Sequence, residues 1–205
     1  FCAGADVVKR LGARLGDEAQ ERTRRELTEP VGYVASLIRS LNKPIIGAIN
    51  GYAIGGGLAL ALLCDIRIAS EKARFAASFV KVGLIPDLGS TFLLPRAIGM
   101  DKALEMMFTG DTIDAAQAER IGLVTRVVPD DEVLKQSMEL ATRIAHGPSI
   151  AVEFIKRGAY RGVHNTFDEQ LDFESYGQNV CRGTQDHQEG VQAFKEKRSP
   201  IFRGL

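Results

Sequence analysis

What this sequence lacks excludes several classes of protein. Its 26 lysine and arginine residues equal its 26 aspartate and glutamate residues, whereas a nucleic-acid binder usually has a basic excess. No apolar run is long enough to span a bilayer, since the longest, 58–64, has the length of a core segment. The three cysteines, Cys2, Cys64 and Cys181, are odd in number and widely spaced, which fits neither a disulfide framework nor a zinc site. We therefore expect a protein of a reducing compartment that binds neither nucleic acid nor membrane.

The first residues have neither a methionine nor a signal-peptide pattern. They read Phe1-Cys2-Ala3-Gly4-Ala5-Asp6, an apolar residue followed by a turn of small residues. This order is typical of the end of a strand. We expect that chain upstream of this strand end is missing, and that the protein is not secreted.

The 205 residues suffice for one large domain with its own core. Short strands alternate with helices as far as about residue 145, and only helices are expected after it. The order predicts an α/β core over 1–145 and a helical region over 146–205. The predicted strands are 43–49, 65–70, 73–77 and 123–128, and the predicted helices are 28–41, 58–63, one from about 90, 100–108, 114–121, 131–146, 149–161, 166–182 with a capping box, and 184–197.

Three consecutive glycines, Gly55 to Gly57, stand immediately before an apolar run in "NGYAIGGGLALALLCD". Glycine costs a helix about 1 kcal/mol relative to alanine, so three need a reason. Without Cβ atoms, a ligand oxygen can reach the first N–H groups of a helix, which have no intrahelical acceptor. Leu58 and Ala59 stand where a phosphate-binding P-loop has Lys and Ser or Thr. The glycines therefore indicate either an oxyanion hole or close packing of the helix under a sheet.

Over essentially its whole length the sequence resembles the crotonase family of enoyl-CoA hydratases and isomerases. The resemblance lies in five segments that occur in order: FCAGADV, KPIIGAINGYAIGGGLALALLCDIRIAS, GLIPDLGSTFLLPRAIG, ALEMMFTGDTIDAAQAERIGLVTRVVP and EGVQAFKEKRSPIF. It implies an α/β fold, a spiral of ββα units followed by C-terminal helices that mediate assembly into a homo-trimer or hexamer. The family's first strands are absent from this sequence.

The resemblance also implies a binding site for an acyl-CoA substrate. The backbone N–H groups of Ala5 and Gly56 are expected to hold the thioester oxygen and to contribute about 3–4 kcal/mol each to an enolate. Ala3 and Asp6 belong to the same turn and are expected to contact the CoA, although Asp6 also suits the N-cap of the next helix. The resemblance implies no metal, and no cofactor other than the coenzyme A of the substrate.

A basic run near the end, Lys195, Lys197 and Arg198, has two interpretations. It complements the dipole of a solvated helix end. Alternatively, the resemblance implies that Lys195 approaches the CoA phosphates of a neighbouring subunit. The helices after Thr166 are expected to expose an apolar surface to such subunits, comprising Phe167, Leu171, Phe173 and Tyr176.

The residues at the expected reaction centre favour an isomerase. The family's hydratases have one Glu two residues after the triple glycine and another before the G-x-I-P loop, and here these places hold Ala59 and Phe79. One acid remains, Asp87 in "GLIPDLGST", where the family's isomerases have an acid. Such an acid suffices to move a proton between two carbons. An apolar pocket with Phe79 is expected to raise the pKa of Asp87.

Other functions compete with this interpretation. Asp87 also suits a helix N-cap or a turn. A crotonase domain that binds acyl-CoA or assembles with partners without catalysis fits the absent carboxylates, and a hydratase remains a further alternative. A related aryl-CoA dehalogenase needs a His on the helix before the Lys-Pro strand, but all three histidines, His146, His164 and His187, lie in the C-terminal helices. A bacterial cytosol or a mitochondrial or peroxisomal matrix fits the composition.

Overall fold

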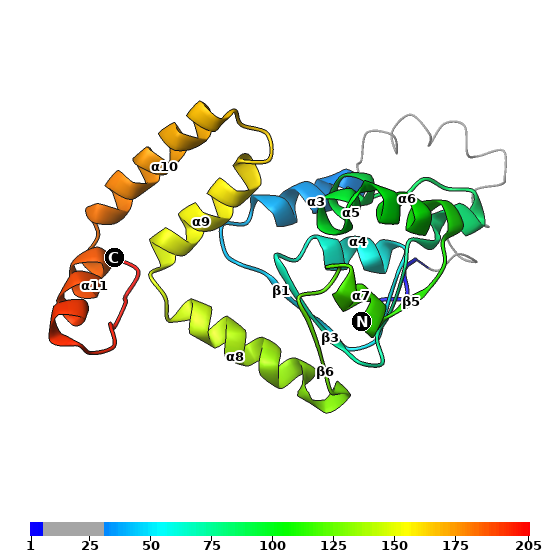
Figure 1. Cartoon of the computed structure of the whole chain (residues 1–205), viewed down its shortest axis with the longest axis horizontal. Coiled ribbons are helices and arrows are strands. Elements are labelled where there is room, and N and C mark those ends of the chain that lie inside the picture. The colour runs from blue at the N-terminus through cyan, green and yellow to red at the C-terminus, as the bar shows by residue number, and fades with distance from the viewer. Residues whose placement is uncertain (6–30) are drawn as a thin grey trace. The chain divides into compact units, whose positions relative to one another are not determined.

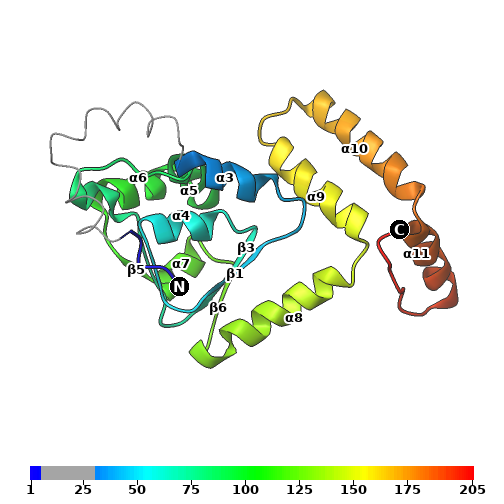
Figure 2. The same cartoon turned by 180° about the vertical axis from the view of Figure 1, so that it is seen from behind.

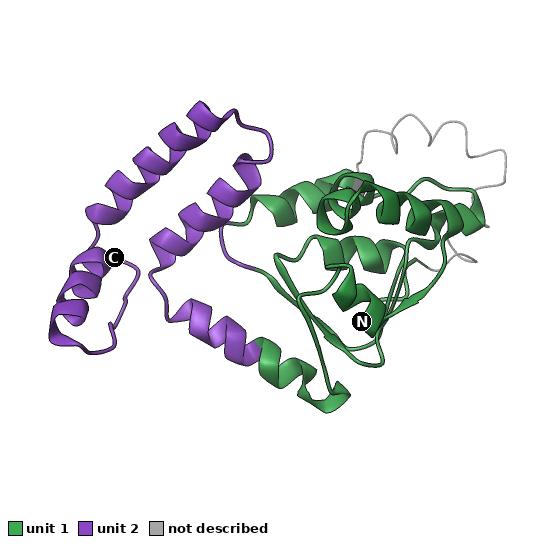
Figure 3. Cartoon of the chain, viewed as in Figure 1, with its two compact units in different colours: residues 1–41, 45–137 green, residues 42–44, 138–205 purple. Residues whose placement is uncertain are grey.

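The computed structural model describes residues 1–5 and 31–205, in two compact units shown in Figure 3. Unit 1 comprises residues 1–41 and 45–137, and unit 2 comprises residues 42–44 and 138–205. The boundary at 137 falls within helix α8, Val133–Ala145. The start expected for the helix over 28–41 lies outside the described residues, and helix α3 covers Val31–Ser40.

The described strands of unit 1 form two three-stranded sheets, and Figure 1 labels β1, β3 and β6 of one sheet and β5 of the other. One sheet is parallel in the order β1-β3-β6, and in the other β2 is parallel to β4 while β4 is antiparallel to β5. The chain enters one sheet at β1 and the other at β2, then returns to both with β3 and β4, so each turn of a spiral adds a strand to each sheet. The strands are β1 Ile46–Ile49, β2 Tyr52–Ile54, β3 Ile66–Ser70, β4 Arg74–Ala76, β5 Ile113–Asp114 and β6 Arg126–Val128.

Helix α4 lies between the strands and helix α5 in Figures 1 and 2. Its side chains Leu58 and Ala61 are buried together with Ile49 and Phe75 of the sheets and Leu94 of α5. Alanines on α4 let the helix approach its neighbours closely, and dense packing of this kind holds the following loops in place. The helical elements of unit 1 are α3, α4 Gly56–Leu62, the 3₁₀ turn η2 Ser78–Val82, α5 Ser90–Ile98, α6 Met100–Thr109, α7 Ala115–Arg120 and the 3₁₀ turn η3 Asp130–Glu132.

Unit 2 contains three helices in addition to the end of α8: α9 Ser149–Arg161, α10 Phe167–Arg182 and α11 Gln185–Glu196. The predicted capping box is confirmed, since Thr166 and Glu169 cap the start of α10 reciprocally. Helices α9 and α10 lie side by side, and Phe154 and Phe173 pack between them with ring centroids 5.9 Å apart. Among the described helices, none combines the length and the apolar character needed to cross a membrane.

Some predicted element boundaries are wrong, and strands β2 and β5 are missing from the prediction. Strand β1 begins at Ile46 rather than Lys43. Strand β6 begins at Arg126 rather than Leu123, because the N–H groups of Leu123 and Val124 donate to the carbonyl of Ala118 at the end of α7. Helix α4 begins at Gly56, two residues before the predicted start. Strand β2 has three residues between a turn and the glycines, so no alternation is long enough to indicate it.

Arg67 of β3 connects three segments of unit 1. Its Nε donates to the carbonyl of Leu123 at 2.7 Å, and its Nη1 donates to the carbonyl of Cys64 at 2.6 Å. Replacing Arg67 by methionine keeps much of the side-chain volume but leaves both carbonyls without this donor. We expect the free energy of unfolding to fall by about 3 kcal/mol. Urea denaturation of the variant measures this loss, and an unchanged midpoint would contradict it.

Candidate active site

Two of the three consecutive glycines are required by the fold. Gly55 has a φ of +54°, which disfavours a side chain. A Cβ atom at Gly57 would lie 1.9 Å from the carbonyl oxygen of Cys2. A Cβ at Gly56, by contrast, would meet no described atom within 4 Å. Backbone conformation therefore explains Gly55 and packing explains Gly57, and neither gives a reason for a glycine at position 56.

The N-terminal turn lies directly beside these glycines. The N–H of Cys2 donates to the carbonyl of Tyr52 at 2.7 Å, and the N–H of Ile54 donates to the carbonyl of Cys2 at 3.1 Å. Cys2 thus pairs with Ala53 in parallel, as expected for the end of a strand. Gly4 has a φ of +91°, and a Cβ there would lie 3.7 Å from the backbone nitrogen of Gly56.

This pairing brings Ala3, Gly4 and Ala5 to the start of α4. Gly56 is the first residue of that helix, so its N–H has no acceptor within the helix. The joint binding of one oxygen by Ala5 and Gly56 stays a prediction, which this arrangement favours. Asp6, expected at the same turn as an N-cap or a CoA contact, lies outside the described residues.

Asp87 lies in the loop between η2 and α5, and it does not cap the helix. The N-cap of α5 is Gly89, which makes no side-chain capping bond. The main-chain carbonyl of Asp87 accepts a hydrogen bond from the N–H of Ser90 at 2.9 Å. Within the described parts of the chain, the carboxylate forms no hydrogen bond or ion pair with another side chain, and the main-chain N–H of Asp87 itself donates to it. The interpretation of Asp87 as an N-cap is therefore wrong, whereas its interpretation as a turn residue is confirmed through its main-chain carbonyl. That turn leaves the carboxylate available for chemistry.

Asp87 is exposed in the single chain, but partial desolvation by the surrounding loop still raises the pKa of its carboxyl above the ordinary value of 3.8, because desolvation disfavours the charged form. The direction agrees with the expectation from the sequence. The places of the two hydratase carboxylates are apolar, since Ala59 is fully buried on α4 and Phe79 is half-buried in η2. Next to this loop, the hydroxyl of Ser90 is buried without a partner in the described structure.

A raised pKa predicts the pH dependence of any reaction in which Asp87 acts as a base. Only the carboxylate accepts a proton, so kcat/KM falls as the pH falls through the pKa of Asp87. We expect this acid limb to lie above pH 3.8. Initial rates between acidic and neutral pH measure it, and the same limb in the Asp87→Asn variant would assign the titration to another group.

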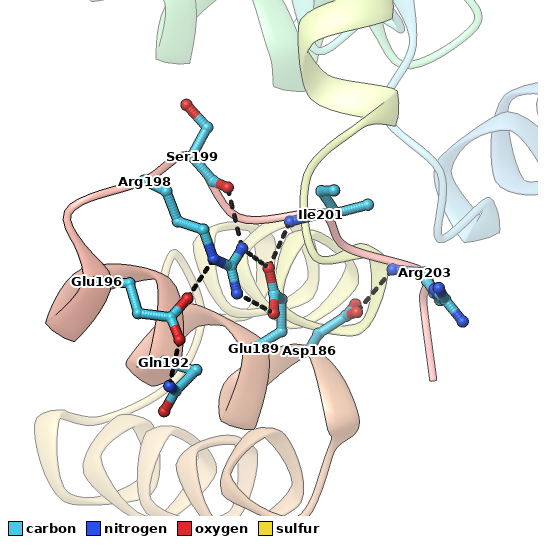
Figure 4. Close-up of polar contacts among 8 residues, drawn as sticks. All are labelled: Asp186, Glu189, Gln192, Glu196, Arg198, Ser199, Ile201 and Arg203. Carbon is cyan, nitrogen blue, oxygen red and sulfur yellow. Dashed lines mark hydrogen bonds and ion pairs between the residues drawn. The ribbon is translucent and has the colours of Figure 1, made fainter.

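The basic run near the C-terminus is only partly free to bind phosphate. Figure 4 shows the Arg198 guanidinium donating to Glu189 and Glu196. The two hydrogen bonds from Arg198 to the Glu189 carboxylate have donor–acceptor distances of 2.6 and 2.9 Å. They lower the pKa of Glu189 to about 2. Lys195 is exposed in the last turn of α11, in unit 2, and its contact with CoA stays a prediction. The sequence reasoning missed that Arg198 is committed to two carboxylates.

The residues 199–205 fold back against the start of α11. The buried carboxylate of Asp186 accepts hydrogen bonds from the N–H groups of Arg203 and Gly204 at 2.7 and 3.0 Å. A pocket of about 440 Å³ lies beside these contacts and is lined by Glu189 and Arg198 among others. The carboxylates of Asp186 and Glu189 beside this pocket accept hydrogen bonds from the protein itself. We therefore interpret these contacts as structural, since they hold residues 199–205 against α11.

The comparisons with known proteins agree with this geometry. The model of the enoyl-CoA hydratase/isomerase family matches residues 1–204. The chain belongs to this family. It is 40% identical to a crotonyl-CoA hydratase of Syntrophomonas wolfei, over 98% of this chain and 75% of the relative. It is 36% identical to the 2,3-dehydroadipyl-CoA hydratase of Escherichia coli, over 100% of this chain and 77% of that protein.

The fold of this chain also matches solved structures of the family. The crystal structure of an enoyl-CoA hydratase from Bacillus anthracis matches with a TM-score of 0.90 and 37% identity, over 100% of this chain and 77% of that one. The predicted crotonase fold, with helices after an α/β spiral, is therefore confirmed. These relatives are named hydratases, and this chain has Ala59 and Phe79 at the two positions where the resemblance places the hydratase glutamates.

Proposed function

We propose that this protein is an enoyl-CoA isomerase that moves a double bond from the β,γ to the α,β position of an acyl-CoA thioester. The observation that supports this most is Asp87, an exposed but partly desolvated carboxylate that pairs with no other side chain of the described residues. It follows the G-x-I-P turn, where the resemblance places an isomerase acid.

The proposed reaction needs one acid and two backbone donors. The Asp87 carboxylate removes a proton from the α-carbon, and the electron pair of that C–H bond delocalises onto the thioester oxygen. The N–H groups of Ala5 and Gly56 hold this oxyanion. Asp87 then returns its proton to the γ-carbon, which leaves the double bond between the α- and β-carbons. No metal and no redox cofactor takes part in this proposal.

The second candidate is hydration of a 2-enoyl-CoA, which the names of the relatives favour. Hydration uses one group to activate water and another to protonate the α-carbon, and the two positions that supply them in the family's hydratases are Ala59 and Phe79. We therefore expect conversion of a 3-enoyl-CoA into the conjugated 2-enoyl-CoA, with little hydration of the latter. Absorbance of the conjugated thioester follows both reactions. Rapid hydration with no isomerisation would favour the hydratase, and neither reaction would favour a non-catalytic acyl-CoA-binding domain.

Assembly into a homo-trimer, or a pair of trimers, is part of the proposal. On α10, Phe167, Leu171 and Tyr176 are exposed in the single chain. Phe173, which was expected to belong to the same surface, instead lies half-buried against Phe154, and the guanidinium of Arg161 stands 4.9 Å from its ring centroid. We expect light scattering at micromolar concentration to give three or six times the mass of the chain. A monomer would contradict this prediction.

We further propose that Lys195 contacts the CoA phosphates and that the protein works in a bacterial cytosol or an organelle matrix. The exposure of Lys195 supports its contact with the CoA phosphates, whereas the neighbouring Arg198 already pairs with Glu189 and Glu196. The two relatives compared above, which come from bacteria, support the second point.

A further inference from the structure

The turn that joins Asp87 to helix α5 has an unusual residue at its first corner. Its closing hydrogen bond runs from the N–H of Ser90 to the carbonyl of Asp87 at 2.9 Å. Both corner residues have positive φ, 51° at Leu88 and 81° at Gly89. These features define a type I′ turn, whose corners usually hold Gly, Asn or Asp. Leucine is strained there, because its Cβ approaches the following carbonyl oxygen.

The backbone of this turn gives no reason for leucine at position 88. A glycine or an asparagine would adopt the same conformation with less strain. Strained residues of this kind persist where the side chain or its position has a use, and they cluster at ligand sites. Leu88 is also only partly buried, so the described residues leave part of its apolar surface uncovered.

Apolar side chains also precede Asp87 in the same loop and face solvent. Leu84 is 45% exposed and Ile85 is 77% exposed. Asp87 thus has uncovered hydrocarbon before and after it in the sequence, although loops normally present polar groups to water. Hydrocarbon is the ligand chemistry that such a surface binds best.

We propose that Leu88 is a specificity-determining residue, whose side chain contacts the apolar acyl chain of a CoA thioester together with Leu84 and Ile85. The inference rests on the proposed function in taking acyl-CoA as the ligand of the Asp87 site. Contact with the uncovered part of Leu88, about a third of the side chain at most, corresponds to about a 2- to 5-fold gain in affinity for a long acyl chain. An acetyl group is too short to gain as much.

The test compares Leu88→Asn with Leu88→Met by calorimetric titration of the full chain with octanoyl-CoA and with acetyl-CoA. Asparagine tolerates positive φ, so we expect its melting temperature to equal or exceed that of the wild type. The Leu88→Asn variant should bind octanoyl-CoA about 2- to 5-fold more weakly than the wild type and should bind acetyl-CoA with nearly unchanged affinity. Methionine restores apolar volume and should recover most of the octanoyl-CoA affinity. Leu134→Asn, at an exposed position on α8, is the matched control. It should change neither the affinity for octanoyl-CoA nor the affinity for acetyl-CoA.

Each outcome bears on the inference separately from the proposed function. Equal losses for both thioesters, or no loss for either, would overturn the role of Leu88, as would a wild type that does not bind octanoyl-CoA. If the wild type binds octanoyl-CoA selectively through Leu88 but isomerises no 3-enoyl-CoA, the isomerase function fails and the inference stands. If it isomerises but Leu88→Asn binds as the wild type does, the inference alone fails.

Discussion

Replacement of Asp87 by asparagine is expected to lower isomerase turnover by about 10²–10⁴-fold. Asparagine keeps the shape of the side chain but cannot accept a proton. The main-chain hydrogen bond from Ser90 to the carbonyl of residue 87 does not depend on the side chain. Acyl-CoA affinity should change little, because the proposed oxyanion donors are backbone groups. Single-turnover rates and calorimetric binding on the same preparation separate the two effects.

The stability of this variant distinguishes a reacting group from a structural one. The pKa of Asp87 is raised in the folded state, so the folded state holds this proton more tightly than the unfolded chain. The bound proton of Asp87 stabilises the folded state at low pH. This contribution to the free energy of unfolding is lost as the pH rises through the pKa that Asp87 has in the folded state. Removing the charge should therefore leave the melting temperature at neutral pH unchanged or slightly higher.

Asp101→Asn is the matched control, because Asp101 is an exposed aspartate in the first turn of α6. It should retain both turnover and stability. If Asp87→Asn instead melts much earlier and keeps its turnover per folded molecule, Asp87 is structural. The non-catalytic acyl-CoA-binding domain would then be the better description of this protein.

Substitution of adjacent glycines by alanine is expected to give opposite results. At Gly57 the new Cβ would meet the backbone of Cys2 at 1.9 Å, so Cys2 or α4 must move. Forced displacement of packed backbone costs about 3 kcal/mol. For a chain of this size that corresponds to a melting temperature lower by about 6–12 °C. Circular dichroism on heating measures the shift.

At Gly56 the new Cβ would meet no described atom within 4 Å, and alanine favours a helix more than glycine does. We expect a melting temperature equal to or above that of the wild type. Turnover should nevertheless fall by about 10²-fold, because a methyl group displaces the thioester oxygen from the donors. Full turnover of Gly56→Ala would show that nothing approaches this glycine during the reaction, and the proposed oxyanion site would then be wrong.

The elements that the sequence predicts correctly rest on local interactions. The capping box of Thr166 and Glu169 joins residues three apart, and α11 begins after Thr184 for the same kind of reason. Glycines also end helices where expected, as Gly110 does after α6 with a φ of +64°. Such features are set by neighbours in the chain, so a single sequence is sufficient to find them.

The candidate site is less local, and the sequence indicates only its parts. The triple glycine and Asp87 are conspicuous in the sequence, and the resemblance to the crotonases assigns them roles. Nothing in the sequence shows that Cys2 lies against Gly57, because more than fifty residues separate them along the chain and the pairing of Cys2 with Ala53 is needed to join them.

By itself the sequence determined the family, most of the helices and the longer strands, and the apolar residues at the two hydratase positions. Only the tertiary structure decided which glycines the packing needs, that Asp87 is not a helix cap, and that Leu88 is strained beside it. The physical reason is range. Capping and periodicity act between neighbours in the chain. Close approach and desolvation depend instead on which distant segments the fold brings together. The conformation of a turn depends on how the elements on either side of it are held.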